Sequence, residues 1–324
     1  MKKVNVAVVG ATGLVGSTIL KVMAERDFPV AALTLLASER SAGRQVAYRS
    51  GIMTVGNLAE ASFEGIDIAF FAAGSEISRE YAPKAAQAGA LVVDNSSMFR
   101  MVPDIPLVVP EVNGGDIPDR GIVANPNCST IQCMPPLHAL KHYGLKRVVY
   151  SSYQAVSGSG MKGLKDLDEN TQVFYPYSIK ANVLPHIDTF REDGYTGEEH
   201  KMINETRKIL HLPDLPVTAT TVRVPVRFGH CVSANVELEN AFDLSELVAR
   251  IAAHEGVVLQ DDPAHNVYPT PAMAEGHDEV FVGRIRRDMS VKNGVNLWIV
   301  ADNVRKGAAT NAVQIALKVL ERTK

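Results

Sequence analysis

Val4-Asn-Val-Ala-Val-Val-Gly10-Ala-Thr-Gly13-Leu-Val-Gly16 is the stretch that decides the fold of the first half of the chain. An apolar run ends at Gly10, and apolar residues recur at helical spacing from Leu14 onward. Glycine permits a sharp turn between a strand and a helix, and the N–H groups of the helix N-terminus can bind a pyrophosphate. The alternative is a tight turn that only packs the helix on the strand. The strand–turn–helix context favours dinucleotide binding.

Apolar runs and helical stretches alternate through the rest of this half. Such alternation predicts a parallel sheet covered by helices on both faces, which is an α/β, Rossmann-like domain. The predicted strands are residues 4–9, 31–37, 66–72, 91–94, 107–109 and 122–124, and the predicted helices are 14–24 and 78–88.

The pattern changes after about residue 128, where the apolar runs become longer and richer in β-branched residues. We expect a mostly antiparallel or mixed sheet with helices such as 244–253 on one side, hence an α+β domain. Residues 308–320 predict a closing helix, and 157–163 and 193–199 predict surface loops. The predicted strands are 147–156, 217–226, 231–239, 280–286 and 295–301.

Composition limits the classes of function. The chain has 324 residues, enough for two domains, and its 46% hydrophobic residues fit a globular protein. A formal net charge of −3 gives no overall basic field for nucleic acid or an anionic membrane. No apolar run approaches the ~20 residues that span a bilayer. Three cysteines are too few for a disulfide framework, which favours the reducing cytosol.

The second predicted strand ends at Ser38-Glu39-Arg40-Ser41. An acidic residue here would hold the ribose 2′-hydroxyl of NAD, whereas an arginine would accommodate the 2′-phosphate of NADP. Because Glu39 and Arg40 are adjacent, both cofactors stay open. We favour Arg40, flanked by the hydroxyls of Ser38 and Ser41, as a phosphate-binding cluster. The alternative is an ordinary solvated loop charge.

Cys128 lies in Asn125-Pro-Asn-Cys128-Ser-Thr130, between a strand and a helix that we expect to run to Leu140. A helix N-terminus stabilises a thiolate, and its N–H groups can hold an oxyanion on a substrate. Position alone leaves a nucleophile and an inert buried thiol equally open. Ser129 or Thr130 could cap the helix. Cys133 and Cys231 lack this setting and are interpreted as packing residues.

A nucleophilic thiol needs a base, and His230 is the histidine with a distinctive setting. It follows Gly229, which separates two strand-like runs, so the imidazole could point into a cleft. On its own the residue favours a structural role. Arg223 lies seven residues earlier, an offset that places the two on opposite faces of an undisturbed strand. Pro225 and Gly229 make a bulge or turn possible, so the offset does not exclude convergence.

Four segments together resemble the aspartate-β-semialdehyde dehydrogenase family over essentially the whole chain. They are Gly10-Ala-Thr-Gly13-Leu-Val-Gly16, Asn125-Pro-Asn-Cys128-Ser-Thr, Ser152-Tyr-Gln154-Ala-Val-Ser-Gly158 and Arg223-x6-His230. The resemblance implies a dinucleotide-binding domain at 1–127, completed by a C-terminal helix at 305–324. It also implies a catalytic and dimerisation domain at 128–304.

The resemblance further implies NADPH-dependent reductive dephosphorylation of L-aspartyl-4-phosphate to L-aspartate-4-semialdehyde through a Cys128 acyl-thioester. His230 would be the general acid/base, and Gln154 would orient the substrate. The implied substrate and phosphate ligands are Arg223 for the α-carboxylate, Arg100 and Lys201 for phosphate, and Glu198 for the ammonium group. The implied cofactor contacts are Gly10, Thr12, Gly13, Leu14, Val15, Ser38, Arg40, Ser41, Ser157, Gly158 and Asn303.

As partners, the resemblance implies inorganic phosphate and a second copy of the chain in a homodimer, although tetramers also occur in the family. It implies a cytoplasmic place in lysine, threonine, methionine and diaminopimelate biosynthesis. Without the resemblance, Glu198 and Lys201 would be interpreted as a surface ion pair at i,i+3.

Three other classes of enzyme or binding protein share parts of this pattern. N-acetyl-γ-glutamyl-phosphate reductase uses the same Cys/His chemistry, and a non-catalytic dinucleotide sensor would share only the first domain. A short-chain dehydrogenase needs Tyr-x-x-x-Lys, and no tyrosine here has a lysine four residues on. The chain also has no HExxH or CxxC grouping, so we expect no metal site.

Overall fold

The computed structural model describes residues 2–322 and divides the chain into two compact units. The first comprises the residues up to Pro126 together with those from Ala308 onward, and the second is Asn127–Gly307. Within residues 2–322, no helix combines the length and apolar character needed to cross a membrane.

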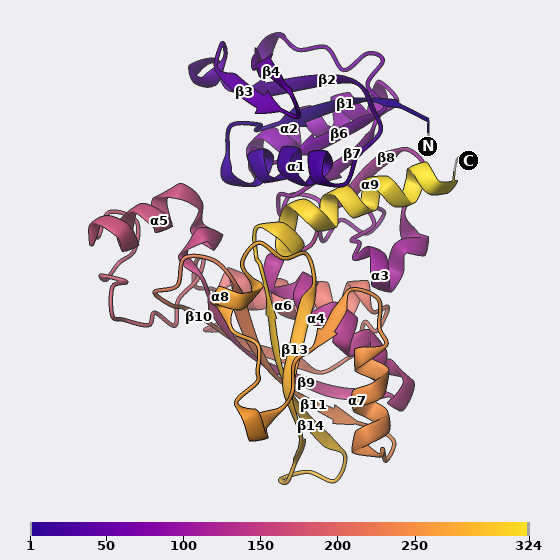
Figure 1. Cartoon of the computed structure of the whole chain (residues 1–324), viewed down its shortest axis with the longest axis vertical. Coiled ribbons are helices and arrows are strands. Elements are labelled where there is room, and N and C mark those ends of the chain that lie inside the picture. The colour runs from indigo at the N-terminus through magenta and orange to yellow at the C-terminus, as the bar shows by residue number, and fades with distance from the viewer. Residues whose placement is uncertain (1, 323–324) are drawn as a thin grey trace. The chain divides into compact units, whose positions relative to one another are not determined.

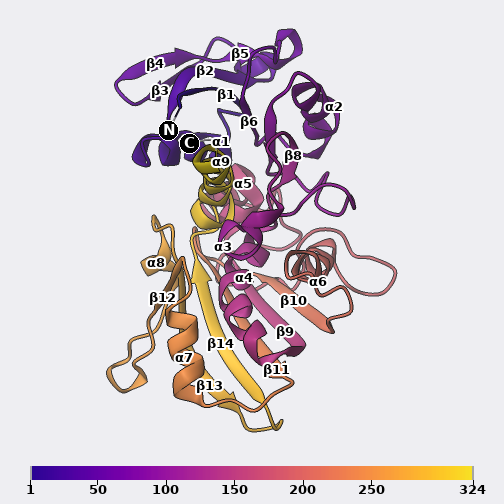
Figure 2. The same cartoon turned by 90° about the vertical axis from the view of Figure 1, so that its right-hand side faces the viewer.

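The first unit is built on a six-stranded parallel sheet in the order β5-β2-β1-β6-β7-β8. Helices α1 and α9 lie side by side (Figure 1), and Figure 2 shows α2 on the other side of the sheet. The prediction of a Rossmann-like α/β domain is confirmed. The strands are β1 Val4–Val9, β2 Val30–Ala37, β5 Gly56–Asn57, β6 Ile68–Phe71, β7 Leu91–Asp94 and β8 Gly121–Ala124. The helices are α1 Leu14–Glu25, α2 Ser75–Gln87, α3 Pro110–Asn113 and α9 Asn311–Arg322.

The core of this unit explains why the C-terminal helix belongs to it. Val6 and Val8 of β1 are fully buried, as the near-continuous apolar run requires. Val313 and Ile315 of α9 are fully buried in the same hydrophobic cluster. A two-stranded antiparallel sheet, β3 Gln45–Tyr48 and β4 Gly51–Thr54, is an addition that the sequence did not predict.

The second unit is built on a six-stranded mixed sheet in the order β10-β9-β11-β14-β13-β12. The three central pairings are antiparallel, and the two edge strands pair in parallel. The α+β prediction is confirmed. The strands are β9 Leu145–Gln154, β10 Val217–Arg223, β11 His230–Leu238, β12 Val257–Leu259, β13 Val280–Asp288 and β14 Gly294–Ala301. The helices are α4 Cys128–Leu140, α5 Gly160–Glu169, α6 Gly197–Ile209, α7 Leu244–Ala252 and α8 Pro271–Ala274.

One face of this sheet is covered by helices, and β9 shows the alternation that results. Val148 and Tyr150 are buried beneath α4 and α6, and the Tyr150 hydroxyl is 3.1 Å from Thr206 Oγ1 of α6. Val149 and Ser151 face the other side and are half-buried. Figure 2 shows α4 running along the covered face.

Two predictions on the first unit are corrected. Residues 107–109 form no strand, only a single parallel bridge between Leu107 and Ala124. Pro106 and Pro110 restrict the backbone at both sides, and Pro110 begins α3. The closing helix begins later than expected, at Asn311, after a π-helical turn at Arg305–Thr310.

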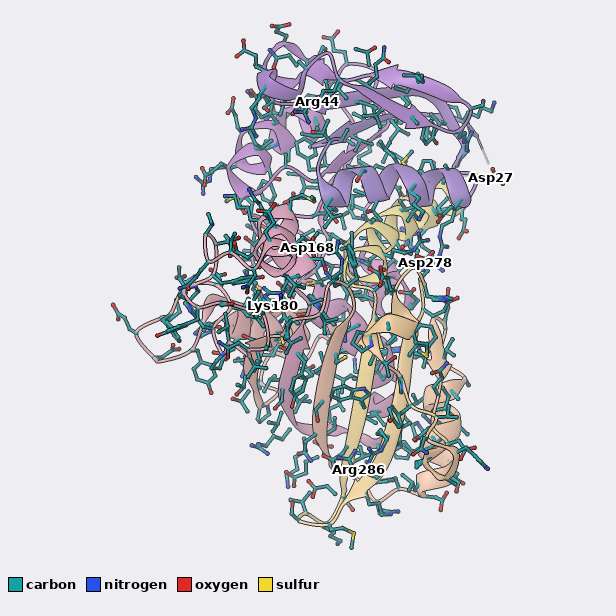
Figure 3. The ribbon with its side chains drawn as sticks, turned by 60° about the vertical axis from the view of Figure 1, so that its left-hand side comes forward. Asp27, Arg44, Asp168, Lys180, Asp278 and Arg286 are labelled. Atoms are coloured by element: carbon teal, nitrogen blue, oxygen red, sulfur yellow. The ribbon has the colours of Figure 1, made fainter. Side chains whose placement is uncertain are left out.

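That π-helical turn begins within the second unit. Asp278, labelled in Figure 3, accepts a hydrogen bond from Arg305 Nε at 2.8 Å. The side chain of Arg305 is therefore anchored where the turn starts.

The surface loop predicted at 157–163 is corrected, and the one predicted at 193–199 is confirmed only for residues 193–196. Residues 157–163 form a 3-10 turn, Val156–Ser159, and the start of α5. A Ser/Gly-rich composition suggested flexibility, but the buried Ser157 side chain is fixed by hydrogen bonds to Asn303. In the segment 193–199, α6 begins at Gly197, where Thr196 and Glu199 form a capping box. The Thr-x-x-Glu spacing was the signal for this helix start.

Candidate active site

Cys128 is the first residue of α4, and the residue before it caps the helix. Asn127 is the N-cap, and its Oδ1 accepts hydrogen bonds from the N–H groups of Ser129 at 2.9 Å and Thr130 at 3.3 Å. The prediction that Ser129 or Thr130 caps the helix is therefore wrong, because an N-cap accepts with its own side chain from residues further on. The Cys128 side chain is only partly buried, whereas Cys133 is fully buried.

The other two cysteines are packing residues, as expected. Burial raises the pKa of the Cys133 thiol, and it raises the pKa of Cys231 to about 12. Neither thiol forms a thiolate near neutral pH, so Cys128 is the cysteine with a nucleophile's setting.

Glu198 connects several of the predicted site residues. Its Oε1 accepts hydrogen bonds from Asn127 Nδ2 at 2.9 Å and from Gln154 Nε2 at 3.1 Å. Its Oε2 is 3.2 Å from Lys201 Nζ, which also donates to Asp188 at 2.8 Å. Glu198 is 5% exposed, so the pair with Lys201 is not the surface ion pair that spacing alone suggested.

The protonation state of Glu198 follows from these contacts. Burial alone would raise the pKa of this carboxyl group. The charge of Lys201 and the hydrogen bond from Asn127 outweigh burial, so the pKa of Glu198 lies below its ordinary value. A buried carboxylate is thus held ionised beside the start of α4.

Arg223 and His230 converge, which settles the question left by their odd offset. The backbone of Ala155 joins them: its carbonyl accepts from Arg223 Nη1 at 2.7 Å, and its N–H donates to His230 Nδ1 at 3.0 Å. A Cβ on Gly158 would lie 2.8 Å from Arg223 Nη1 and 3.2 Å from His230 Nε2. Only glycine leaves room for both side chains at this point.

His230 presents one defined nitrogen. Because the Ala155 N–H can only donate, Nδ1 is the acceptor, and the hydrogen of the neutral ring is on Nε2. Burial and then the charge of Arg223 hold the pKa of His230 well below its usual range, so the ring is neutral. In the described residues, His230 Nε2 and Arg223 Nε are buried without a hydrogen-bond partner. Two unpaired donors in one buried place fit an anionic or carbonyl oxygen.

The predicted phosphate-binding turn joins β1 to α1 in the first unit. Gly10 has φ +84°, and a Cβ there would lie 2.6 Å from the carbonyl oxygen of Ala72. The N-cap of α1 is Gly13, which makes no side-chain capping bond, so the first N–H groups of the helix are uncapped. Such a terminus fits a pyrophosphate. Thr12, Leu14 and Val15 lie in this turn and the first helical turn.

The other predicted ligands of this unit lie at the same carboxyl edge of its sheet. Ser38, Arg40 and Ser41 follow β2 in a 3-10 turn, in which Arg40 is exposed and Ser41 is buried. Arg100 follows β7 and is 8% exposed. Its guanidinium donates to the carbonyl oxygens of Asn125 at 3.0 Å and Asn95 at 3.1 Å.

Ser157 and Asn303 form a second polar pair in the other unit. Asn303 Nδ2 donates to Ser157 Oγ at 3.0 Å, and Asn303 Oδ1 accepts from the Gly229 N–H at 3.0 Å. Both side chains are nearly fully buried. Asn303 therefore fixes the turn that precedes His230.

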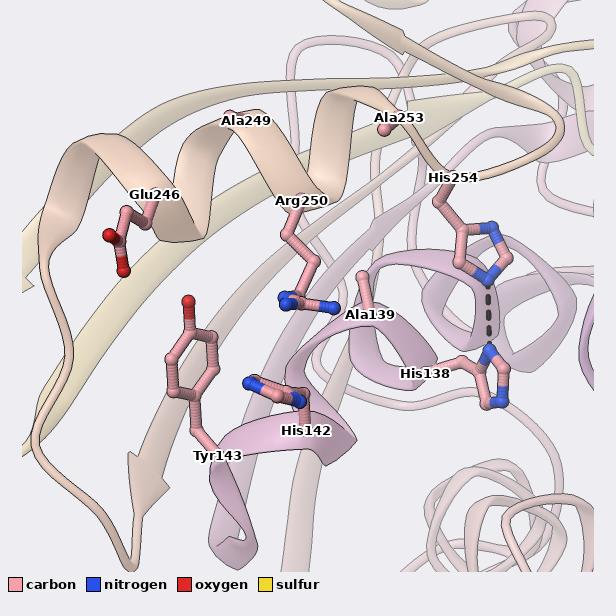
Figure 4. A pocket seen from close by; sticks show the side chains of 9 residues that line it. All are labelled: His138, Ala139, His142, Tyr143, Glu246, Ala249, Arg250, Ala253 and His254. Carbon is pink, nitrogen blue, oxygen red and sulfur yellow. Dashed lines mark hydrogen bonds between the residues drawn. The ribbon is translucent and has the colours of Figure 1, made fainter.

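A separate cleft between α4 and α7 contains none of the predicted catalytic residues. His138 Nδ1 and His254 Nε2 are 2.9 Å apart across it (Figure 4). His254 Nδ1 lies 2.9 Å from the Glu255 carbonyl oxygen, so this nitrogen bears hydrogen and His138 donates to His254 in the neutral pair. The cavity of about 770 Å³ is lined by His138, Ala139, His142, Tyr143, Glu246, Ala249, Arg250, Ala253 and His254. In residues 2–322, no group of three or more His, Cys, Asp or Glu side chains is arranged to hold a metal ion.

Sequence reasoning missed several residues that build the site. Asn127 could have been found, because an asparagine directly before a helix is a strong N-cap signal. Glu205, whose carboxylate accepts the Asn127 N–H at 2.6 Å, and Ala155, which joins Arg223 to His230, had no local signal. Their roles depend on pairings between segments distant in sequence.

Fold and site together define a class: a two-domain dehydrogenase with a helix-terminal cysteine. Two family descriptions match, "Semialdehyde dehydrogenase, NAD binding domain" over residues 5–119 and "Semialdehyde dehydrogenase, dimerisation domain" over residues 134–306.

Comparison with individual proteins shows which family of this class the chain belongs to. The chain is 53% identical to aspartate-semialdehyde dehydrogenase from Aquifex aeolicus and 48% identical to that from Bacillus subtilis, in each case over 96% of both chains. Its fold matches the crystal structure of aspartate semialdehyde dehydrogenase II from Vibrio cholerae complexed with ASA, with TM-score 0.95, 43% identity and 99% coverage of both chains. The chain belongs to the aspartate-semialdehyde dehydrogenase family and is an oxidoreductase that uses a nicotinamide dinucleotide.

Proposed function

We propose that the protein converts L-aspartyl-4-phosphate to L-aspartate-4-semialdehyde, with release of inorganic phosphate, through an acyl-thioester on Cys128. The observation that carries this proposal is the group of buried donors in the second unit. Arg223 Nε and His230 Nε2 are both without partners there, and the ionised Glu198 lies beside the helix that begins at Cys128. An amino-acid substrate offers oxygen atoms to the donors and an ammonium group to the carboxylate.

Each side chain has a distinct part in binding. The planar fork of Arg223 suits the α-carboxylate of the substrate. Gln154 donates its amide hydrogen to Glu198, so its carbonyl oxygen is left to orient the substrate. Arg100 and Lys201 supply the positive charge for the phosphate. Glu198 binds the ammonium group.

In the chemical step, Cys128 reacts as the thiolate that the start of α4 stabilises, and its sulfur bonds to the acyl carbon while the bond from that carbon to the phosphate oxygen breaks. Phosphate leaves with the electron pair, and the thioester that remains is a better hydride acceptor than a carboxylate. When NADPH is bound, it would supply that hydride; the bond from the carbon to the Cys128 sulfur then breaks, which releases the aldehyde and restores the thiolate. The Nε2–H of His230 donates to the substrate oxygen that gains negative charge, as do the N–H groups at the start of α4.

We further propose NADP rather than NAD as the cofactor. The uncapped α1 terminus and the crowded Gly10 fit a pyrophosphate, and the exposed Arg40 suits a 2′-phosphate. Gly10, Thr12, Gly13, Leu14 and Val15 would contact the pyrophosphate, and Ser38, Arg40 and Ser41 the 2′-phosphate. Ser157, Gly158 and Asn303 would contact the nicotinamide half.

On this proposal the first unit is the dinucleotide-binding domain, and the second is the catalytic and dimerisation domain. The second face of this sheet, which α8 covers only in part and which carries Ser151, Tyr153, Ser233 and Trp298, would form the interface of a homodimer. The enzyme would act in the cytoplasm, in lysine, threonine, methionine and diaminopimelate biosynthesis.

The test follows the reverse reaction, with inorganic phosphate and either NADP or NAD. L-Aspartate-4-semialdehyde should support NADPH formation, and N-acetyl-glutamate semialdehyde should not. Cys128→Ala should abolish turnover while NADP still binds, and Cys133→Ala is the matched control. Unchanged turnover in Cys128→Ala would reject the proposal, and preference for the glutamyl substrate would favour the acyl-phosphate reductase alternative.

A further inference from the structure

Two carboxylates of α6 hold the residue before the nucleophile. Glu205 Oε2 accepts the backbone N–H of Asn127 at 2.6 Å, and Glu198 Oε1 accepts its side-chain Nδ2 at 2.9 Å. The two glutamates are seven residues apart, about two helical turns, so they project from the same face of α6. Asn127 is thus fixed at its backbone and at its side chain from one helix.

The hydrogen bond to Glu205 has the features of a strong interaction. Glu205 is 1% exposed and Asn127 is 6% exposed, so water does not compete with the bond. A distance of 2.6 Å is short for an N–H donor and is typical of a charged acceptor. Burial lowers the pKa of Lys208, one turn further along α6, and the negative charge of Glu205 offsets part of that shift.

We propose that Glu205 is a positioning residue for Cys128 and acts through the Asn127 backbone. Glu205 fixes the peptide that enters α4, and the Asn127 side chain in turn binds the N–H groups of Ser129 and Thr130. Cys128 lies between these two anchors, so its sulfur is placed relative to the rest of the second unit. The kinetic test of this inference rests on the proposed function, whereas a second test, the rate at which a reagent alkylates Cys128, does not.

The amide of glutamine offers the same acceptor oxygen without the charge, so Glu205→Gln keeps the bond to Asn127. Glu205→Ala removes the acceptor, and Glu205→Asp keeps the charge but withdraws the acceptor by one methylene. Thr206→Val is the matched control, because it removes a buried α6 hydrogen bond, to Tyr150, that does not reach Asn127.

We expect kcat to fall about 10- to 100-fold in Glu205→Ala and Glu205→Asp, because small displacements of a nucleophile have large kinetic effects. KM should change less than about twofold, since the substrate ligands remain. Glu205→Gln should keep kcat within about threefold of the wild type, and Thr206→Val should do the same even though it loses stability. If Glu205→Ala fails to fold, Glu205→Asp and Glu205→Gln carry the comparison.

A second measurement needs no substrate. The rate at which iodoacetamide alkylates Cys128, followed by mass spectrometry of its peptide, should change in Glu205→Ala and Glu205→Asp but not in Glu205→Gln or Thr206→Val. A wild-type enzyme without aspartate-semialdehyde activity would reject the proposed function and leave this assay valid. Equal alkylation rates and equal kcat in all four variants would overturn the positioning role, and so would a Glu205→Gln variant as impaired as Glu205→Ala.

Discussion

At the scale of single residues, the imidazole of His230 is defined by one backbone contact. The Ala155 N–H occupies Nδ1, so the neutral ring offers a donor at Nε2. Full burial and the charge of Arg223 keep the ring neutral in the folded state. On the proposed mechanism, His230 would begin the reaction as a hydrogen-bond donor to the substrate oxygen. Nε2 could accept the thiol proton only if the ring hydrogen moved to Nδ1, and that move would break the hydrogen bond from the Ala155 N–H.

His230→Asn tests this description, because the asparagine Oδ1 can take the place of Nδ1 and accept from Ala155. We expect kcat to fall by about 100-fold or more, since the Nε2 donor is lost. The variant should also alter the dependence of stability on pH. The folded pKa of His230 lies below the unfolded value near 6.5, so the unfolded state binds more protons under that pH.

Wild-type stability should therefore fall as the pH drops below about 6.5, by up to about 1.4 kcal/mol per pH unit from this residue. Urea unfolding at pH 7.5 and at pH 5.5 measures the effect, and His230→Asn should lose that part of it. An undiminished kcat would show that the ring is not a donor to the substrate. An identical pH dependence of stability in the two proteins would show that the ring is not buried in its neutral form.

At the scale of elements, the turn between β1 and α1 is the best-defined feature of the first unit. Gly10 has a positive φ, and a Cβ added to it would lie 2.6 Å from the carbonyl oxygen of Ala72. Gly65 has a similar φ of +73°, but nothing lies within 4 Å of its added Cβ. Substitutions at these two glycines therefore distinguish the effect of backbone strain, which both share, from the effect of crowding, which only Gly10 has.

We predict that Gly10→Ala weakens NADP binding at least about tenfold, because the Cβ forces the turn away from the geometry that a pyrophosphate needs. Gly65→Ala should cost about 1 kcal/mol of stability through φ alone and leave the NADP affinity unchanged. Isothermal titration calorimetry of both variants makes the comparison. Equal affinities for NADP in the two variants would contradict a cofactor site at this turn.

The elements also show what sequence could and could not predict. The runs at 4–9 and 91–94 matched β1 and β7 because strands buried on both faces are continuous apolar stretches. The end of α4 at Leu140 was predicted, despite Pro135 and Pro136 inside the helix, whereas its N-cap was misplaced by two or three residues. The helical nature of 157–163 was not predicted, because Ser157 is ordered by Asn303, far away in sequence. The composition of the segment itself gives no sign of a hydrogen-bond partner so far away in the sequence.

At the scale of the whole molecule, α4, α6 and α7 cover one sheet face of the second unit, and α8 covers the other face only in part. Tyr153 and Trp298 meet on the partly covered face with ring centroids 5.6 Å apart, and Ser233 lies in the strand between theirs. A half-buried sheet face with aromatic side chains suits an interface between subunits.

If this face forms the proposed homodimer interface, Ser233→Glu should convert the dimer to a monomer, because paired copies would each bury an unpaired carboxylate. Ser245→Glu makes the same change on the exposed surface of α7 and should leave the dimer intact. Sedimentation velocity distinguishes the two species. A Ser233→Glu protein that remains dimeric would place the interface elsewhere.

The central claim is that Cys128 becomes acylated during the reaction. Its most direct test mixes the enzyme with L-aspartyl-4-phosphate in the absence of NADPH, followed by acid quench and peptide mass spectrometry. The account predicts one aspartyl group on the peptide that contains Cys128, released as free aspartate by hydroxide, and no adduct in Cys128→Ala. An adduct on another residue, or normal turnover with Cys128 never modified, would contradict it.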